Sequence, residues 1–242
     1  MINHFRDVTL LPISGNYLVI ACDSSAAIGL KKYDQVSVSP AITAACCLRV
    51  PLLELFCLGA QPICIIDLIG NEYEDTGKQM LAGIRSGMRI AAIEVPLNGS
   101  TEENMMTVMS SIGITVIGEL PMKVQLPAAE VGNRLFQVGI PLVGEDVSVN
   151  LDQLPSYELI KNLQKESGVT DLLPVGSKGI GFEASLMAKR SSLEPIFYQP
   201  NSPELLKSAG PATVVLAAVK EDLAAELAKK YPMMKEIGRF TS

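Results

Sequence analysis

Segments with strand periodicity alternate with segments of helical periodicity along the chain of 242 residues. Residues 7–11, 17–21 and 63–69 are short apolar runs of the kind that form strands. Residues 41–58 and 75–91 instead carry apolar side chains at helical spacing. Because alternating strands and helices bury their apolar sides against one another, this pattern predicts an α/β (α+β) fold with helices packed on mixed sheets.

The second half of the chain continues the alternation, with no internal repeat and no low-complexity tract. Further strands are expected at 92–97, 112–120, 171–175, 213–219 and 237–240, and further helices at 101–108, 156–165, 180–190 and 221–230. Two prolines within residues 121–127 mark a junction between domains. We therefore expect two domains of similar size, residues 1–122 and 123–242.

Acidic residues outnumber basic ones, with 26 Asp and Glu against 20 Lys and Arg, so the formal net charge is −6. Binding that is driven by the phosphate backbone of nucleic acids needs a basic surface, so we expect no nucleic-acid partner. An acidic protein can still bind nucleotides where metal ions bridge its carboxylates to phosphates. The charge therefore leaves metal-dependent nucleotide binding open.

The hydrophobic content of 48% raises the question of a membrane span. Arg49 and Glu54 interrupt the apolar segment 41–58, so no run approaches the ~20 residues that a span needs. We therefore expect no membrane association, and the first residues lack the pattern of a signal peptide. The five cysteines form no C-x-x-C pair, which favours buried, reduced thiols in a cytoplasmic protein.

Several common catalytic motifs are absent from the sequence. Gly77-Lys78 is followed by Gln79, so the phosphate loop G-x-x-x-x-G-K-[ST] is missing, and no G-x-G-x-x-G follows a strand. His4 is the only histidine, which excludes histidine-based triads and His-rich metal sites. What remains is carboxylates and turns at the ends of strands and helices.

Four carboxylates stand out by their positions. Asp7 begins the first expected strand and Asp23 ends the second. Glu54 lies in an apolar helix and Asp67 in an apolar strand, where a carboxylate without a partner is costly. Each of these two should therefore face a cation, a cluster of donors or a metal ion. The structural alternative is an exposed helix face or a salt bridge to an arginine: Arg49, Arg85 or Arg89.

Two expected strand-to-helix turns could bind an anion. Asn98-Gly99-Ser100-Thr101 offers backbone N–H groups at a helix start together with two hydroxyls. Gly176-Ser177-Lys178-Gly179 offers Lys178, which could hold a phosphate or polarise a hydroxyl. An ordinary turn with a helix cap is the alternative for the first, and a solvated lysine is the alternative for the second.

The order of these pieces resembles the aminoimidazole ribonucleotide synthetase-like (PurM-like) ATP-binding superfamily, which includes thiamine-monophosphate kinase, selenophosphate synthetase and the hydrogenase-maturation dehydratase. Arg6-Asp7 stands where the kinase-type members carry an N-terminal acidic pair, and Cys22-Asp23 resembles their Thr-Asp. Leu53-Glu54-Leu55 with Gly59-Ala60-Gln61-Pro62 is similar to their Asn-Asp-Leu…Gly-Ala-x-Pro helix end. Further similar motifs at 83–87, 98–101, 132–141 and 176–180 extend the resemblance over nearly the whole chain.

The resemblance implies that ATP binds with Mg²⁺ at acidic residues of the N-terminal domain, and that two N-terminal sheets join in a homodimer. The site residues it implies are Asp7, Asp23 and Glu54 as metal ligands, Asn98, Gly99, Ser100, Thr101 and Ser177 at the phosphates, and Lys178 and Asp67 in catalysis. In this picture Lys178 neutralises charge on the transferred group, and Asp67 is the candidate general base.

Three departures from the family pattern bear on the substrate. Glu54 and Lys178 each replace an aspartate, and Ser100 stands where an acid is usual. Together with the short C-terminal half, these features are most similar to the branch described as α-ribazole kinase, an ATP-dependent phosphotransferase that acts on the 5′-hydroxyl of a nucleoside-like small molecule. The alternatives are another ATP-dependent reaction of the superfamily, such as amidine cyclisation, and a non-catalytic nucleotide-binding sensor.

Overall fold

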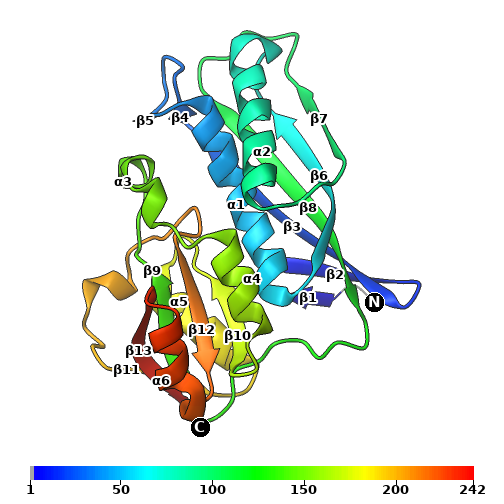
Figure 1. Cartoon of the computed structure of the whole chain (residues 1–242). Helices are drawn as coiled ribbons and strands as arrows, with labels where there is room; N and C mark the ends of the chain where they lie inside the picture. Colours follow the sequence, from blue (N-terminus) through cyan, green and yellow to red (C-terminus); the bar gives the residue numbers. More distant parts are fainter. Residues whose placement is uncertain (1–2) are drawn as a thin grey trace. The chain divides into compact units, whose positions relative to one another are not determined.

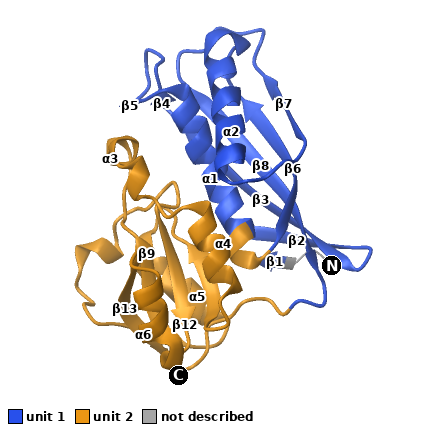
Figure 2. Cartoon of the chain, viewed as in Figure 1, with its two compact units in different colours: residues 1–55, 60–124 blue, residues 56–59, 125–242 orange. Residues whose placement is uncertain are grey.

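The computed structural model describes residues 3–242, and the chain divides into two compact units (Figures 1 and 2). The first unit extends to residue 124 without residues 56–59, and the second consists of residues 56–59 and 125–242. Each unit is built on one main sheet, and the mixture of sheets and helices confirms the predicted fold class.

The first unit contains a six-stranded sheet with the order β1-β2-β3-β8-β6-β7. Its strands are β1 (Asn3–Phe5), β2 (Val8–Ile13), β3 (Asn16–Ala26), β6 (Gln61–Ile69), β7 (Leu97–Thr101) and β8 (Ser111–Pro121). All neighbours pair antiparallel except β6 and β7, which are parallel. A separate parallel pair, β4 (Ile28–Gly29) and β5 (Val36–Ser37), follows β3. The central strand β8 is therefore the last of the six along the chain.

Two helices, α1 (Pro40–Leu58) and α2 (Lys78–Ile90), pack together on one face of this sheet (Figure 1). A π-helical turn, Tyr73–Gly77, precedes α2, which starts a few residues later than predicted. The helices approach closely: a Cβ atom added at Gly83 of α2 would lie 2.0 Å from the carbonyl oxygen of Ala41 in α1. A glycine at position 83 is therefore a packing requirement of this helix pair.

The other face of the first sheet has no helix of the described part of this unit on it. In β3, Val19 and Ala21 are buried beneath the helices, so Ile20 between them points to the opposite face. The register places Ile20 opposite Ile117 of β8, which also pairs with Cys64 of β6. We call this surface the open face; its apolar residues are Leu11, Leu18, Ile20, Cys64, Ile66, Leu68 and Ile117.

The helix α1 is the most apolar segment of the first unit. By length and composition it could cross a membrane, with 19 residues and a mean hydropathy of 1.8 over its most apolar window. The expectation that Arg49 and Glu54 keep this segment too short is therefore corrected. Because 67% of that window is buried inside the protein, the hydrophobicity of α1 is accounted for by packing in the core.

The second unit contains a five-stranded antiparallel sheet with the order β10-β12-β9-β13-β11. Its strands are β9 (Arg134–Gly139), β10 (Val169–Pro174), β11 (Glu194–Phe197), β12 (Val214–Val219) and β13 (Met234–Thr241). Its helices are α3 (Glu145–Val149), α4 (Tyr157–Lys165), α5 (Gly179–Lys189) and α6 (Glu221–Lys230), with 3₁₀ turns at Leu151–Gln153 and Pro203–Leu205.

Both faces of this second sheet are covered. All six residues of the central strand β12 are buried. Val214, Leu216 and Ala218 belong to a core cluster that includes residues of α5. Val215 and Ala217 point to the opposite face and are equally buried. The second sheet is therefore a complete hydrophobic layer, unlike the first.

Two local predictions are wrong. Residues 101–108 form no helix, because Thr101 ends β7 and a turn follows in which Glu102 Oε1 accepts hydrogen bonds from the backbone N–H groups of Asn104 and Met105. The strand expected at 92–97 begins only at Leu97. The predicted helices at 156–165, 180–190 and 221–230 and the strands at 112–120, 171–175, 213–219 and 237–240 are confirmed to within a few residues.

Candidate active site

Two of the predicted acids lie in one row across the first sheet. Ile114 of β8 pairs with Asp23 of β3 on one side and with Asp67 of β6 on the other, and Asp67 pairs with Gly99 of β7. Ile114 is buried, so this row faces the helices α1 and α2. Neighbouring strands lie about 4.8 Å apart, which separates the backbones of the two acids by roughly 10 Å. The register thus brings Asp23 and Asp67 to the same height in the sheet.

Asp23 is half-buried within β3. Burial raises the pKa of its carboxyl, and hydrogen bonds from the backbone of Ser24 and the thiol of Cys47 act in the opposite direction. Burial and the nearby Asp23 charge also raise the pKa of the Cys47 thiol, so this cysteine is unreactive. A carboxylate that is desolvated in this way gains stability from an added cation. Asp23 is therefore a half-buried carboxylate whose ionised form is partly desolvated.

Asp67 is almost completely buried, with 2% of its surface exposed. Burial raises the pKa of its carboxyl, while its own backbone N–H and the positive charge of Arg85 in α2 act to lower it. Arg85 was one of the three arginines considered as partners for the acids. A Cβ atom added at Gly99 would lie 2.3 Å from Cγ of Asp67 and 2.3 Å from its carbonyl oxygen. The close approach of Asp67 is therefore one reason for a glycine at position 99.

Asp7 and Glu54 lie elsewhere in the first unit. Asp7 is exposed in the turn between β1 and β2, two residues before Thr9. Thr9 pairs with Ile20, and Asp23 lies three residues beyond Ile20, so Asp7 and Asp23 lie at the same end of the β2–β3 pair. Glu54 lies in α1 and is half-buried. Within residues 3–242, no three His, Cys, Asp or Glu side chains form a ready-made metal cluster.

The segment Asn98–Thr101 differs from its predicted form. It is no strand-to-helix turn but part of β7, the strand at one edge of the first sheet. Asn98, Gly99 and Ser100 are exposed, and the hydroxyl of Thr101 donates to Glu103 Oε1 at 2.6 Å. The idea of a helix N-terminus as an anion cradle is therefore wrong here. What the structure provides instead is an exposed edge strand, on which the Ser100 and Thr101 hydroxyls already donate hydrogen bonds within the chain.

The second predicted turn, residues 176–179, has the expected form. It connects β10 to α5, and Gly179 adopts a positive φ of 82° at the start of the helix. Ser177 and Lys178 are exposed. Lys178 Nζ lies 4.2 Å from the centre of the Phe182 ring, one turn further along α5. Lys178 is therefore a solvent-accessible cation, held over an aromatic ring at a helix start.

Sequence reasoning missed a polar lock in the first unit, formed by Lys31, Asn71, Glu72 and Thr107. Lys31 Nζ donates to Glu72 Oε2 at 2.6 Å and to the carbonyl oxygen of Thr107 at 3.0 Å. The backbone N–H and the hydroxyl of Thr107 donate to Glu72 at 2.7 Å each. Asn71 Nδ2 donates to the Thr107 hydroxyl, and its Oδ1 accepts from the backbone of Ser111. Three donors thus converge on the Glu72 carboxylate: Lys31 Nζ and the backbone N–H and hydroxyl of Thr107.

The polar lock determines the charge state of Glu72. The hydrogen bond from Lys31, followed by those from Thr107, lowers the pKa of Glu72 to about 2. These residues come from three connections that lie far apart in the sequence, and no spacing rule links them. The sequence signal is that Asn71-Glu72 follows the apolar strand β6 after a single glycine, Gly70.

Comparison with solved structures identifies the fold. Thiamine monophosphate kinase from Aquifex aeolicus superposes with a TM-score of 0.69 at 15% identity, over 98% of this chain and 89% of that one. A structure described as AaThiL complexed with AMPPCP and TMP gives a TM-score of 0.68 at 16% identity, over 98% and 84%. A HypE–HypF complex gives 0.68 at 14% identity, over 96% and 86%.

Comparison with known sequences identifies a distant relative but no family. No protein-family model matches the sequence. An uncharacterized protein of Synechocystis sp. (strain ATCC 27184 / PCC 6803 / Kazusa) is 23% identical over 132 residues, which is 54% of this chain and 38% of that protein. The match thus spans well under half the length of that relative.

The chain therefore has the fold of these proteins, the PurM-like fold that the order of its motifs predicted.

Proposed function

We propose that this protein is an ATP- and Mg²⁺-dependent small-molecule kinase. The observation that carries the proposal is the position of Asp23, a desolvated carboxylate at the same end of the β2–β3 pair as Asp7. It stands in a fold shared with a kinase that was solved with AMPPCP, an ATP analogue. All five cysteines are free, but only Cys47 and Cys57 are buried as expected, whereas Cys46 and Cys64 are half-buried and Cys22 is exposed. A cytoplasmic location is part of the proposal.

The residues present suit Mg²⁺ when nucleotide supplies part of the coordination. Mg²⁺ prefers oxygen ligands, keeps several waters and is commonly held by one or two carboxylates together with substrate phosphates. Asp7 and Asp23 would provide these carboxylates, with Glu54 as the third candidate. Bound in this way, the ion would neutralise the phosphate oxygens of ATP. Because no three such side chains form a cluster within residues 3–242, nucleotide phosphates and water would have to complete the coordination.

The remaining candidates have separate roles in the proposal. Asn98, Gly99, Ser100 and Thr101 would contact phosphate from the exposed edge of β7, together with Ser177. Lys178 would neutralise charge on the transferred group. Asp67 would accept the proton of the acceptor hydroxyl, because burial raises its pKa in the direction that a general base needs.

We propose the 5′-hydroxyl of α-ribazole as the acceptor. The oxygen of this hydroxyl forms the new bond to the γ-phosphorus of ATP while the bond to the β-phosphate oxygen breaks. The products are ADP and the 5′-phosphate, and the hydroxyl proton passes to Asp67. Support comes from the similarity of the sequence departures at Glu54, Ser100 and Lys178 to the α-ribazole kinase branch.

The open face supports the proposed homodimer. A stripe of apolar side chains on a sheet marks an interaction surface, since monomeric proteins rarely expose such contiguous area. Leu68 in β6 is 61% exposed. A second copy of the same face would cover it in a two-fold arrangement.

The deciding experiment measures ADP and product together. The protein is incubated with Mg-ATP and, separately, α-ribazole, thiamine monophosphate or an aminoimidazole precursor, and products are identified by mass spectrometry. We expect phosphorylated α-ribazole. Asp23→Asn should lower turnover at least about a hundredfold, whereas Asp152→Asn, at an exposed residue of the second unit, should leave it unchanged.

Two outcomes favour the alternatives. Turnover with an aminoimidazole precursor instead of a nucleoside would indicate a cyclisation-type reaction. Tight Mg-ATP binding without turnover of any acceptor would indicate a nucleotide sensor, an alternative that Ser100 and Lys178 favour because they stand at usually acidic positions.

A further inference from the structure

Helix α5 carries an aromatic residue on its solvent-facing side. Ile180, Ala184 and Met187 of this helix are buried in the core cluster of the second unit. Phe182 lies outside that cluster and is 44% exposed, on the same side of the helix as the exposed Ser185. Packing in the core therefore does not account for a phenylalanine at this position.

The ring of Phe182 has a different partner, the side chain of Lys178. Lys178 directly precedes α5, and its Nζ lies 4.2 Å from the centre of the ring. An ammonium group within about 6 Å of a ring centre is attracted by the negative face of the aromatic ring. The ring thus favours one arrangement of a side chain that would otherwise sample many rotamers.

The backbone fixes the direction from which Lys178 approaches the ring. Gly179 follows it with a φ of 82°, in the left-handed region that favours glycine. A Cβ atom added at this glycine would lie 2.8 Å from the carbonyl oxygen of Leu205 and 2.9 Å from that of Lys207. The turn is therefore packed closely on the segment 205–207. Lys178 is thus constrained at its backbone by this turn and at its ammonium group by the ring.

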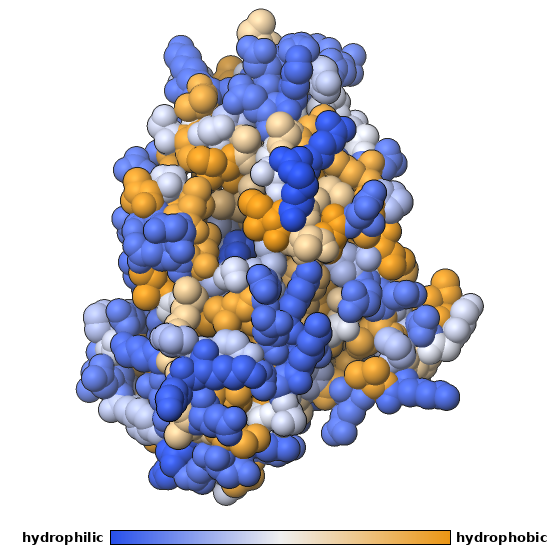
Figure 3. Space-filling model, in the orientation of Figure 1, coloured by the Kyte–Doolittle hydropathy of each residue, from blue (hydrophilic) through white to orange (hydrophobic). Residues whose placement is uncertain are grey.

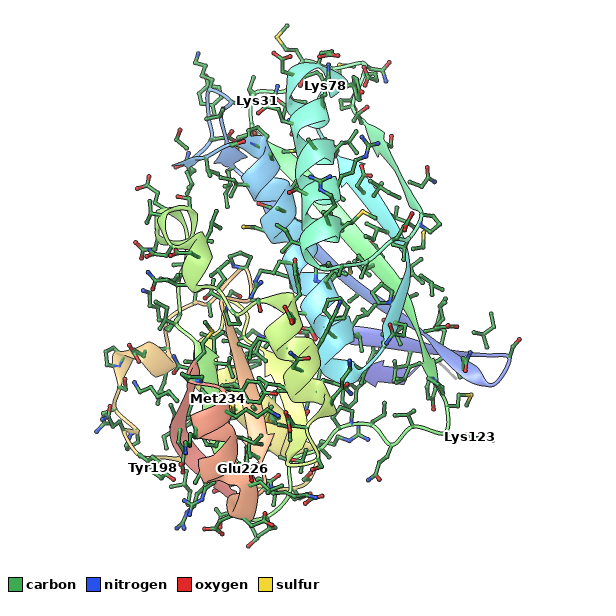
Figure 4. The ribbon with its side chains drawn as sticks, viewed as in Figure 1. Lys31, Lys78, Lys123, Tyr198, Glu226 and Met234 are labelled. Carbon is green, nitrogen blue, oxygen red and sulfur yellow. The ribbon has the colours of Figure 1, made fainter. Side chains whose placement is uncertain are left out.

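The partner of Lys178 distinguishes it from other lysines of the chain. Lys31, labelled in Figure 4, is bound to Glu72 at 2.6 Å. Lys207, beside the turn, pairs with Asp146 at 3.8 Å. Within residues 3–242, no acidic side chain forms an ion pair with Lys178. Because an aromatic ring has no net charge, it holds the ammonium group without neutralising it, and the positive charge remains available to an anion.

We propose that Phe182 is a positioning residue, which holds Lys178 in place to bind the terminal phosphate of ATP. This inference rests on the proposed function, in which Lys178 neutralises charge on the transferred group. A lysine acts on a phosphate as a point charge, so the place of Nζ decides how strongly it acts. The ring acts through the lysine alone, by reducing the conformational entropy that this side chain loses when it binds the phosphate.

The first measurement tests the pair without any ligand. The full chain is labelled with ¹³C-lysine, and the NMR signal of the Lys178 side chain is assigned by its loss in Lys178→Met. In the parent, the ring current of Phe182 should shift the Hε protons of Lys178 upfield. Phe182→Leu should abolish this shift, and Phe182→Trp should retain it. A Lys178 signal that is the same in the parent and in Phe182→Leu overturns the proposal.

The second measurement tests the coupling to the nucleotide, by calorimetric titration of AMPPCP in the presence of Mg²⁺. Lys178→Met should weaken AMPPCP binding about tenfold, and Phe182→Leu about two- to fivefold. In a chain that already carries Lys178→Met, Phe182→Leu should have no further effect, because the ring acts only through the lysine. Phe182→Trp keeps an aromatic face and should restore the affinity of the parent.

Tyr33→Leu is the matched control. It removes another exposed ring beside a lysine, since Lys32 Nζ lies 5.1 Å from the centre of the Tyr33 ring, and it should leave AMPPCP binding unchanged. If Phe182→Leu weakens binding equally with and without Lys178, the role of the ring is structural and the proposal is overturned. The proposal also fails if Lys178→Met binds AMPPCP as the parent does. Failure of the kinase function is a separate result, in which binding and coupling are as expected but no acceptor is phosphorylated.

Discussion

The two main sheets of this protein differ in how their apolar faces are covered. In the second unit, helices occupy both faces, and every residue of the central strand β12 is buried. In the first unit, α1 and α2 cover one face, and the open face is left to solvent within the described chain. Apolar atoms also interrupt the polar surface of the first unit in the space-filling view (Figure 3).

This difference indicates what each unit depends on. A sheet that is buried on both faces can be stable by itself, because its apolar area is removed from water within one chain. A sheet with an apolar open face gains further stability only from a partner. The second sheet is thus covered within its own unit, and the first sheet has the open face that the proposed dimer would cover. The following predictions test that contrast, from the largest expected effect to the smallest.

The largest effect is expected in the central strand of the second sheet. Ala217→Lys places a charge at a fully buried position of β12 and should destabilise the second unit by at least about 4 kcal/mol. Urea unfolding followed by circular dichroism measures the loss. Glu226→Lys, on the exposed side of α6, is the control and should cost little. A well-folded Ala217→Lys variant would mean that the second sheet is less closed than described.

The next effect concerns the covered face of the first sheet. Gly83→Ala adds a methyl group 2.0 Å from the carbonyl oxygen of Ala41, so α1 and α2 must separate, at a cost of about 2–3 kcal/mol. The control is Gly113→Ala in β8, where the nearest atoms lie 3.9 Å away and the change should stay within about 0.5 kcal/mol. Equal stability of the two variants would contradict the close helix approach.

On the open face, a charge should change association rather than folding. Ile117→Lys should convert a dimer into a monomer in sedimentation experiments, and its midpoint of thermal unfolding at high dilution should stay near that of the parent. Ile117→Val keeps the surface apolar and should remain dimeric. If the parent chain is already monomeric at high concentration, the proposed sheet-to-sheet dimer is refuted.

The smallest expected change in the free energy of unfolding is electrostatic, and it depends on pH. Glu72 has an ordinary pKa of 4.5 and a folded-state pKa of about 2, so its ionised form is favoured by folding. Its contribution is fully present above pH 4.5 and is lost as the pH falls toward 2. Glu72→Gln should therefore be less stable than the parent at neutral pH, with a difference that shrinks in acid. Glu74→Gln, which breaks only an exposed pair with Lys78, should show a small difference throughout.

The sequence predicted the elements that carry strong periodicity. The apolar spacing of α1, α4 and α6 and the runs that became β6, β8 and β12 correspond to their observed positions. The prediction from sequence was wrong at residues 98–108, where Gly99 and Thr101 resembled a turn with a helix cap. Their strand conformation is determined by pairing with β6, a partner distant in the sequence.

The candidate site was predictable only in part, for a related reason. Both acids could be singled out, Asp67 because an acid in an apolar run is costly and Asp23 because it ends an expected strand. Their common row could not, because it depends on the register of both strands against Ile114. No spacing pattern links the residues of the polar lock around Glu72. Such a cluster forms where loops that are distant in the sequence come together in the fold, so the spacing of residues along the sequence does not predict it.

The position of β8 at the centre of the first sheet has a consequence for biosynthesis. A ribosome releases β3, α1 and β6 before it has made Ser111–Pro121, the strand that pairs with both β3 and β6. Until then, a helix apolar enough to cross a membrane has no completed sheet to pack against. The nascent chain is therefore exposed to aggregation or mistargeting over this interval, and a chaperone that holds α1 would protect it.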